Sequence, residues 1–193
     1  MSSPTGIAWA LLPEIVLSAW TLVVLLVIAW RHRTAEDSRL AGWLSFAGIL
    51  MSGAALALLW TEGARPAGLA MMIALDDYRY AAGALILLSA AGTVLVSLRY
   101  MERENLIAPE YYPLTLMATA GMMFLAGSED FMVLFLGLEV MSIAVYVLAG
   151  YDRRNIFSSE AALKYFLSGH SRPGSSSTAS RSSTGPRGTR ISS

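Results

Sequence analysis

The sequence contains no cysteine and carries little charge. Without cysteine the chain cannot form disulfides, thiolate zinc sites or cysteine-ligated iron–sulfur clusters, and it cannot attach a c-type haem. Its two histidines, His32 and His170, are too few and too far apart in sequence to build a metal site alone. Charged residues make up 15% of the 193 residues, against about 25% in ordinary proteins. With 55% hydrophobic residues, the composition excludes a disordered chain and indicates a membrane protein.

Long apolar runs predict an all-α, polytopic membrane helix bundle. A helix rises about 1.5 Å per residue, so about 20 apolar residues cross the roughly 30 Å hydrocarbon core. A partial sixth helix over 156–167 is too short to span the bilayer. The five segments expected to be transmembrane helices are residues 7–30, 41–60, 80–100, 112–127 and 131–150.

The arginines in the short loops predict the orientation of the chain. Basic residues tend to stay on the cytoplasmic side of a membrane. Only Arg65 and Arg79 occupy the second and fourth loops, so we expect the N-terminus outside the cytoplasm of a bacterial inner (plasma) membrane. The first, third and fifth loops hold Arg31, Arg33, Arg39, Arg99, Arg103, Arg153 and Arg154.

The composition changes abruptly at Ser168. Residues 168–193 consist almost wholly of Ser, Gly, Arg, Thr and Pro and contain no acidic residue. Such a tract cannot bury enough apolar surface to offset its ordering entropy, so we expect a disordered tail. The formal net charge of zero is therefore an average, because residues 1–167 have 10 basic and 14 acidic residues, a net of 4 negative charges.

Two interpretations of the tail compete. One is a genuine basic tail that is attracted to anionic lipid headgroups. The other, which we favour, is a lost reading frame near Ser168, because a natural tail rarely begins halfway through a membrane helix. The 13 arginines and one lysine are typical of GC-rich coding DNA, whose shifted frames tend to encode Ser, Arg, Gly and Pro. The coding DNA around codon 168 distinguishes the two interpretations.

Ionisable residues inside the predicted spans are the strongest functional signal. A charge near the bilayer centre costs several kcal/mol unless it is paired or faces water. Glu139 lies about midway along residues 131–150, and Ser142 and Tyr146 follow it at helical spacing. We expect this polar stripe to point into the bundle, where desolvation and a nearby cation together tune a proton-transfer group. The alternative is a protonated glutamate that bonds to a neighbouring helix.

Two further candidates lie in the partial sixth helix. Lys164 is the only lysine of the chain, and Glu160 precedes it by four residues, the favourable order for a helical ion pair. As an exposed pair the two would contribute only about 0.2–0.5 kcal/mol. A lysine desolvated inside the membrane would instead be a proton-relay candidate. Glu139, Lys164 and Glu160 are therefore the predicted proton-transfer residues.

The remaining carboxylates are expected to lie at membrane surfaces. Glu14 follows Pro13 close to the start of the first span, and we interpret it as an interfacial residue. The sequence contains no GxGxxG, no Walker A loop and no nucleophile constellation, and it offers no support for binding nucleic acid. The carboxylates expected to be solvated at helix ends are Asp76, Asp77, Glu129 and Asp130.

Several stretches make the chain resemble a known family. The most distinctive run from Pro109-Glu110-Tyr111-Tyr112-Pro113 through Gly121-Met122-Met123, followed by Leu134-Phe135-Leu136-Gly137-Leu138-Glu139 and Tyr146-Val147-Leu148-Ala149-Gly150. The start Leu11-Leu12-Pro13-Glu14 and the segment Glu160-Ala161-Ala162-Leu163-Lys164-Tyr165 fit the same family. Over about residues 7–167, the chain resembles subunit N of the proton-pumping NADH:quinone oxidoreductase, respiratory complex I.

The resemblance implies an antiporter-like membrane-arm subunit, which couples quinone reduction to proton translocation. Such subunits contain two inverted five-helix repeats and bind no cofactor themselves, while NAD, flavin, iron–sulfur clusters and quinone are bound elsewhere in the complex. The expected partners are the other membrane-arm subunits and the lipid bilayer. In this family the glutamate matched by Glu139 works with a lysine of the seventh helix, and Glu160 and Lys164 match polar residues of the sixth.

The sequence also departs from the family pattern. The seventh helix with its lysine and the whole second repeat would lie beyond residue 167, so residues 1–167 are interpreted as the N-terminal part of the antiporter-like domain. A proton path needs entry, relay and exit, and we therefore expect no catalytic or pumping activity from this chain alone. One alternative is a subunit of a multisubunit cation/proton antiporter. Another is a small non-transporting membrane scaffold whose basic tail binds lipid.

Overall fold

The structure is a computed structural model that describes residues 9–31, 35–62, 73, 76–104, 108–152 and 156–170. Within these residues the chain is helical, and the one strand-like pairing is an isolated antiparallel bridge between Ile73 and Ser128. This confirms the all-α class. The helices are α2 (Leu12–Trp30), α3 (Ala35–Glu62), α4 (Asp77–Arg103), α5 (Tyr111–Gly127), α6 (Phe131–Ala149) and α7 (Ile156–His170).

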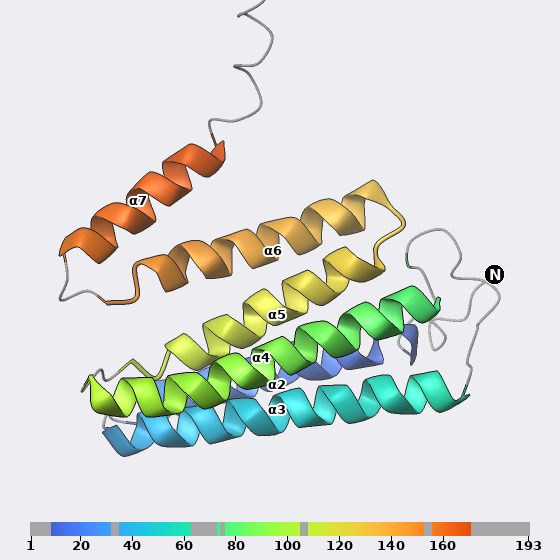
Figure 1. Ribbon diagram of the computed structural model, residues 1–193, viewed down its shortest axis with the longest axis horizontal. Coiled ribbons are helices and arrows are strands. Elements are labelled where there is room, and N and C mark those ends of the chain that lie inside the picture. The colour runs from blue at the N-terminus through green and yellow to red at the C-terminus, as the bar shows by residue number, and fades with distance from the viewer. Residues whose placement is uncertain are drawn as a thin grey trace, which may run out of the picture.

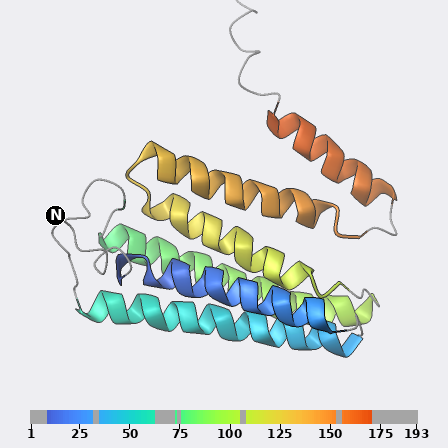
Figure 2. The ribbon, with the colours of Figure 1, turned by 180° about the vertical axis from the view of Figure 1, so that it is seen from behind.

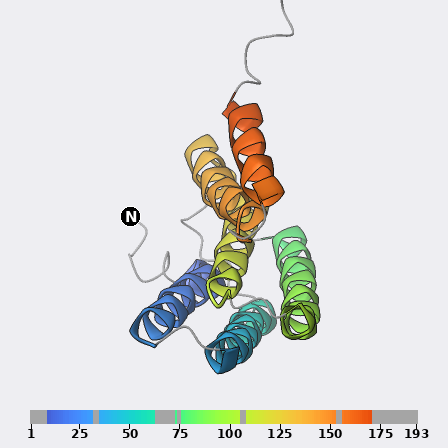
Figure 3. The same ribbon diagram turned by 90° about the vertical axis from the view of Figure 1, so that its left-hand side faces the viewer.

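Helices α2, α3, α4 and α5 form a bundle, and α6 and then α7 are stacked on one side of it (Figures 1 and 2). Viewed along the helices, α2, α3 and α4 surround one edge of α5, while α6 and then α7 lie progressively farther from α3 (Figure 3). Apolar side chains of α2, α3, α4 and α5 form a single buried core, which includes Leu17, Leu56, Val94 and Leu116. By contrast α6 buries only Gly137 and Ala144, so most of its surface has no partner in the described chain.

Four helices are long and apolar enough to cross a membrane, namely α2, α3 from Asp37 to Thr61, α4 and α6. The expected count of five was wrong by one on this measure, because α5 has only 17 residues. At about 1.5 Å per residue it is about 25 Å long, short of the roughly 30 Å hydrocarbon core. This length suits its place in the bundle, since α5 is flanked by other helices on several sides.

Two glycines bring α5 and α6 into close contact. A Cβ atom added to Gly121 of α5 would lie 2.7 Å from the backbone nitrogen of Met141, and one added to Gly137 of α6 would lie 3.0 Å from the carbonyl oxygen of Gly121. Only glycine lets the two backbones approach this closely, as in many membrane helix pairs. The short connection through Ser128 to Asp130 makes the two helices antiparallel neighbours.

The segment after α6 differs slightly from the expected boundaries. Helix α7 has 15 residues and ends at His170, three residues beyond the predicted end of the partial sixth helix. It remains too short to span the bilayer. The expected disordered tail of residues 168–193 lies, from residue 171 on, outside the described residues.

Candidate functional site

Glu139 lies near the middle of α6, and its side chain is exposed in the folded chain. Helix α6 contacts α5 through Gly137, Met141 and the buried Ala144. Successive residues of a helix turn by about 100°, so Glu139 is rotated by about 200° from Gly137 and points away from α5. The expectation that this carboxylate points into the bundle is therefore not met within the described chain.

The face of α6 that carries Glu139 also carries Ser142 and Tyr146, and α7 contacts part of this face. Tyr146 is half-buried, and its ring makes edge-on contacts with Tyr165 and Phe166 of α7, with ring centroids 5.2 and 5.6 Å away. Ser142 lies between Tyr146 and Glu139 in the helical stripe and is also half-buried. One end of the predicted polar stripe is thus covered by α7, while the end that carries Glu139 stays open.

A carboxylate on such a surface needs a partner in a membrane. The side chains around it on α6 are large and exposed, including Phe135, Leu136 and Leu138. Within the described residues Glu139 makes no ion pair and no side-chain hydrogen bond. Because an isolated charge in hydrocarbon costs several kcal/mol, this face requires a proton, water or a cation from outside the described helices.

The other two predicted residues pair with each other. The Lys164 ammonium lies 2.6 Å from the Glu160 carboxylate, four residues earlier on α7. Their side chains are 73% and 52% exposed, so the structure confirms the helical ion pair and places it on the surface of α7. No ion pair within the described residues joins Lys164 to Glu139.

The sequence pattern did not predict one buried ion pair of this bundle. Glu14 of α2 and Arg79 of α4 form an ion pair of 2.6 Å, with side chains only 2% and 4% exposed. The same Arg79 nitrogen donates a hydrogen bond of 2.9 Å to the backbone carbonyl of Ala10. Glu14 is expected to lie at the membrane interface, and the structure places it in the first turn of α2, where it is buried and links α2 to α4.

Three neighbouring groups hold this pair in place. Arg79 lies in the first turn of α4, where its backbone N–H donates to the capping Asp76 carboxylate at 3.0 Å. Its side chain lies against Gly127, where an added Cβ would come within 2.7 Å of the Arg79 Nε. On α2, the carbonyl of Pro13 accepts a hydrogen bond of 2.9 Å from the buried Ser52 of α3. Parts of α2, α3, α4 and α5 therefore meet around one ion pair.

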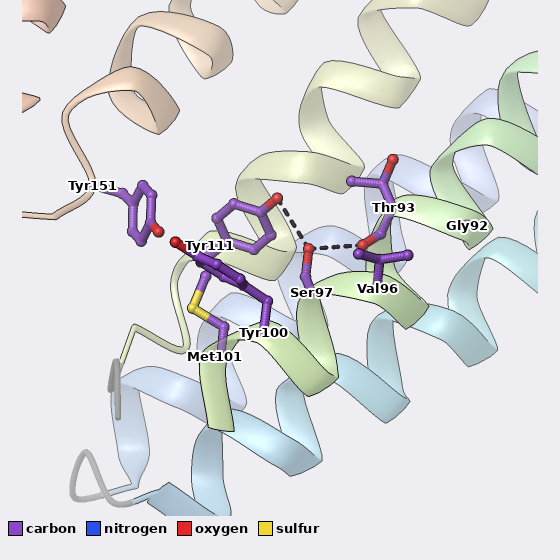
Figure 4. Close-up of a pocket in the computed structure, with 8 residues that line it drawn as sticks. All are labelled: Gly92, Thr93, Val96, Ser97, Tyr100, Met101, Tyr111 and Tyr151. Atoms are coloured by element: carbon purple, nitrogen blue, oxygen red, sulfur yellow. Dashed lines mark hydrogen bonds between the residues drawn. The ribbon is translucent and has the colours of Figure 1, made fainter. Parts of the chain in front are cut away.

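A second polar site opens between α4 and the beginning of α5. It is a groove of about 550 Å³, which we call the tyrosine groove, and it is lined in part by Ser97, Tyr100, Tyr111 and Tyr151 (Figure 4). Ser97 and Tyr111 hydroxyls lie 3.1 Å apart in a hydrogen bond, and Tyr111 and Tyr151 rings meet at 5.4 Å. Tyr151 follows the end of α6, and burial raises the pKa of its hydroxyl, with smaller contributions from nearby Tyr100 and Tyr111.

The described residues contain no cluster of three or more His, Asp or Glu side chains that could hold a metal ion. Their titratable groups include single carboxylates and ion pairs within an apolar bundle. The carboxylates differ sharply in their surroundings. Glu14 is paired and buried, Glu160 is paired and exposed, and Glu139 is exposed among apolar residues.

Comparison with known proteins identifies relatives of this sequence. Residues 128–174 match the family model described as NADH:quinone oxidoreductase/Mrp antiporter, TM, and they include α6 and α7 with Glu139, Glu160 and Lys164. NADH-quinone oxidoreductase subunit N of Trichlorobacter lovleyi is 39% identical over 159 residues, which are 82% of this chain and 32% of that relative.

Two other relatives match the chain with similar identity and over a similar length. Subunit N of Granulibacter bethesdensis is 40% identical over 157 residues, 81% of this chain and 32% of the relative. NAD(P)H-quinone oxidoreductase subunit 2 of Thermosynechococcus vestitus is 39% identical over 165 residues, 84% of this chain and 31% of the relative. The chain spans about a third of the length of the curated relatives it matches.

Proposed function

We propose that this chain acts as a membrane-arm subunit of an NADH-quinone oxidoreductase. It is similar to subunit N of such enzymes over about four fifths of its length. In this role it contributes to the transfer of protons that accompanies quinone reduction. The helices agree with the role, since four of them are long and apolar enough to cross a membrane.

The observation that carries the proposal is the position of Glu139. It is the one carboxylate of the described chain that lies in mid-span, on an apolar helix face and without an ion-pair partner. A carboxylate so placed can bind and release a proton, and each exchange changes the charge near the α6 surface by one unit. A cation on a further helix packed against this face would respond by a change in its own proton affinity, which couples the two sites.

Glu160 and Lys164 belong to the same proposal as secondary proton-transfer candidates. Their ion pair lies on α7, whose aromatic residues contact Tyr146 on the Glu139 side of α6. The Glu14–Arg79 pair has a different role in this proposal. It links α2 to α4 and lies against the end of α5, the helix of this bundle on which α6 packs.

The charge distribution supports the proposed orientation. Among the described residues, the exposed arginines Arg31, Arg39, Arg99 and Arg103 lie at the end of the bundle where α2 and α4 finish and α3 begins. Arg79 lies at the opposite end and is buried in its ion pair, so it does not count as a loop charge. We propose that the basic end faces the cytoplasm of a bacterial inner membrane and that the N-terminus lies outside.

The proposed partners are the other membrane-arm subunits of the enzyme. In this proposal NAD, flavin, iron–sulfur clusters and quinone are bound by those and other subunits, and this chain contributes no redox group. Affinity purification of the tagged chain from membranes of its own host tests the assignment. Co-purification of NADH:quinone reductase activity and its redox subunits is expected. Recovery of the chain in the membrane with no reductase subunit would contradict it.

A further inference from the structure

A second groove, distinct from the tyrosine groove and from Glu139, lies on the outer surface between α3 and α4. Its volume is about 290 Å³. Two helices line it at the basic end of the bundle, α3 near its beginning and α4 near its end. The lining residues are Arg39 and Trp43 from α3, and Leu95, Leu98, Arg99 and Glu102 from α4.

The groove is lined by two arginines and one glutamate, so its positive charges outnumber its negative ones. Arg39 and Glu102 form an ion pair across the groove, with Nε 2.5 Å from Oε1. Arg99 is exposed and makes no ion pair or side-chain hydrogen bond with any described residue. The groove therefore carries a net charge of one positive unit beside an apolar wall.

On both helices the groove is charged near the end of the bundle and apolar one turn deeper in the span. On α3 the charged Arg39 comes first and the 57% exposed Trp43 lies one turn deeper in the span. On α4 Arg99 lies near the helix end, and Leu95, 43% exposed, lies one turn deeper. Four residues correspond to about 6 Å along a helix. Tryptophan at this depth is typical of the membrane interface, and arginine above it reaches toward the headgroups.

We propose that this groove binds one anionic phospholipid. The headgroup phosphate lies between the Arg99 and Arg39 guanidiniums, which suit a phosphate as planar hydrogen-bond donors. The beginning of an acyl chain lies over Trp43 and Leu95. The net positive charge of the groove favours an anionic lipid over a zwitterionic one of the same shape. Neither the similarity to subunit N nor the proton-transfer proposal is needed for this inference.

Native mass spectrometry of the full chain in detergent tests the proposal. The chain is titrated with phosphatidylglycerol or with phosphatidylcholine of the same acyl chains. One tightly retained phosphatidylglycerol is expected, held more strongly than phosphatidylcholine. The Arg99→Gln variant is expected to weaken phosphatidylglycerol binding about fivefold, because it removes one of the two guanidiniums that contact the phosphate, a loss of about 1 kcal/mol.

Two further variants separate a specific site from general surface charge. Arg103→Gln removes an exposed arginine of the same helix end that does not line the groove, and it should leave binding unchanged. Glu102→Gln removes the competing carboxylate and should tighten binding, a result that damage to the fold cannot produce. Circular dichroism of each variant confirms that its helices are intact.

Several results would overturn the proposal. They are equal retention of the two lipids, equal effects of Arg99→Gln and Arg103→Gln, or weaker binding by Glu102→Gln. Displacement of phosphatidylglycerol by millimolar inorganic phosphate would show a simple anion site in which the apolar wall has no part.

Discussion

The carboxylate of Glu14 and the guanidinium of Arg79 lie 2.6 Å apart, buried between α2 and α4 near one end of the bundle, although 65 residues separate them in the sequence. Both side chains are almost fully buried. Desolvating two charges is costly, and the pair is tolerated because its charges cancel and Arg79 also donates to the carbonyl of Ala10. The pair therefore fixes α2 against α4 and makes each charge dependent on the other.

This dependence predicts a strongly non-additive pair of substitutions. Arg79→Gln leaves a buried, uncompensated carboxylate, and the expected loss of stability is about 3–5 kcal/mol. The double variant Glu14→Gln with Arg79→Gln should lose much less than the sum of the single losses. Thermal unfolding in detergent measures the cycle. Glu102→Gln, which breaks the exposed pair with Arg39, is the control and should cost less than about 1 kcal/mol.

The close contact between α5 and α6 predicts that Gly121 tolerates alanine less well than Gly53, a glycine of α3 that lies in open space. Gly121→Ala places a methyl group 2.7 Å from the backbone nitrogen of Met141, so α6 must move away and the variant should unfold at a lower temperature. Gly53→Ala in α3 meets nothing within 4 Å and should be neutral or stabilising, by up to about 1 kcal/mol. Equal Tm changes for the two variants would contradict the close contact.

The exposed pair on α7 predicts a small structural effect. Lys164→Gln removes an ion pair whose members are both more than half exposed, so stability should change by less than about 0.5 kcal/mol. The difference should vanish at high salt, because exposed charges are screened. A Tm that stays low in high salt would show that Lys164 supports the fold in another way. Given an intact fold, any change in proton transfer by this variant reports on chemistry.

The tyrosine groove predicts an alkaline effect on stability. Burial raises the pKa of Tyr151 above its ordinary value of 10.0. The folded chain then holds this proton more tightly than the unfolded chain does, so the stabilisation is complete below pH 10 and is lost as the pH rises through the raised pKa. Tyr151→Phe should reduce the fall in Tm across this alkaline range. An unchanged Tm–pH curve for this variant would contradict the assignment.

Much of the fold could be predicted because membrane helices are recognisable in a sequence as long apolar runs. The segment expected at 131–150 is helical from Phe131 to Ala149, and the one expected at 80–100 lies within Asp77–Arg103. The fourth predicted span is the one that falls short in length, since α5 is apolar but has only 17 residues, at the lower limit for a transmembrane helix. Its surface contacts several other helices of the bundle.

The faces of the helices were harder to predict. Helix α6 is apolar on nearly every side, so its pattern did not show that Gly137 and Ala144 would face α5 and turn Glu139 away. The Glu14–Arg79 pair depends on a contact between distant segments, which local sequence cannot reveal. One signal was available: an arginine and a glutamate each lie in the first turn of an apolar helix, on the same predicted side of the membrane.

The most direct test of the account is the effect of Glu139→Gln on proton transfer by the enzyme that contains this chain. Membrane vesicles from the host are supplied with NADH, and the pH gradient formed for each NADH oxidised is measured. Glu129→Gln is the control, since Glu129 is an exposed carboxylate just before α6. We predict that Glu139→Gln loses the larger part of the gradient while Glu129→Gln keeps it, with equal amounts of assembled enzyme. An unchanged gradient in Glu139→Gln would contradict the assignment of this carboxylate to proton transfer.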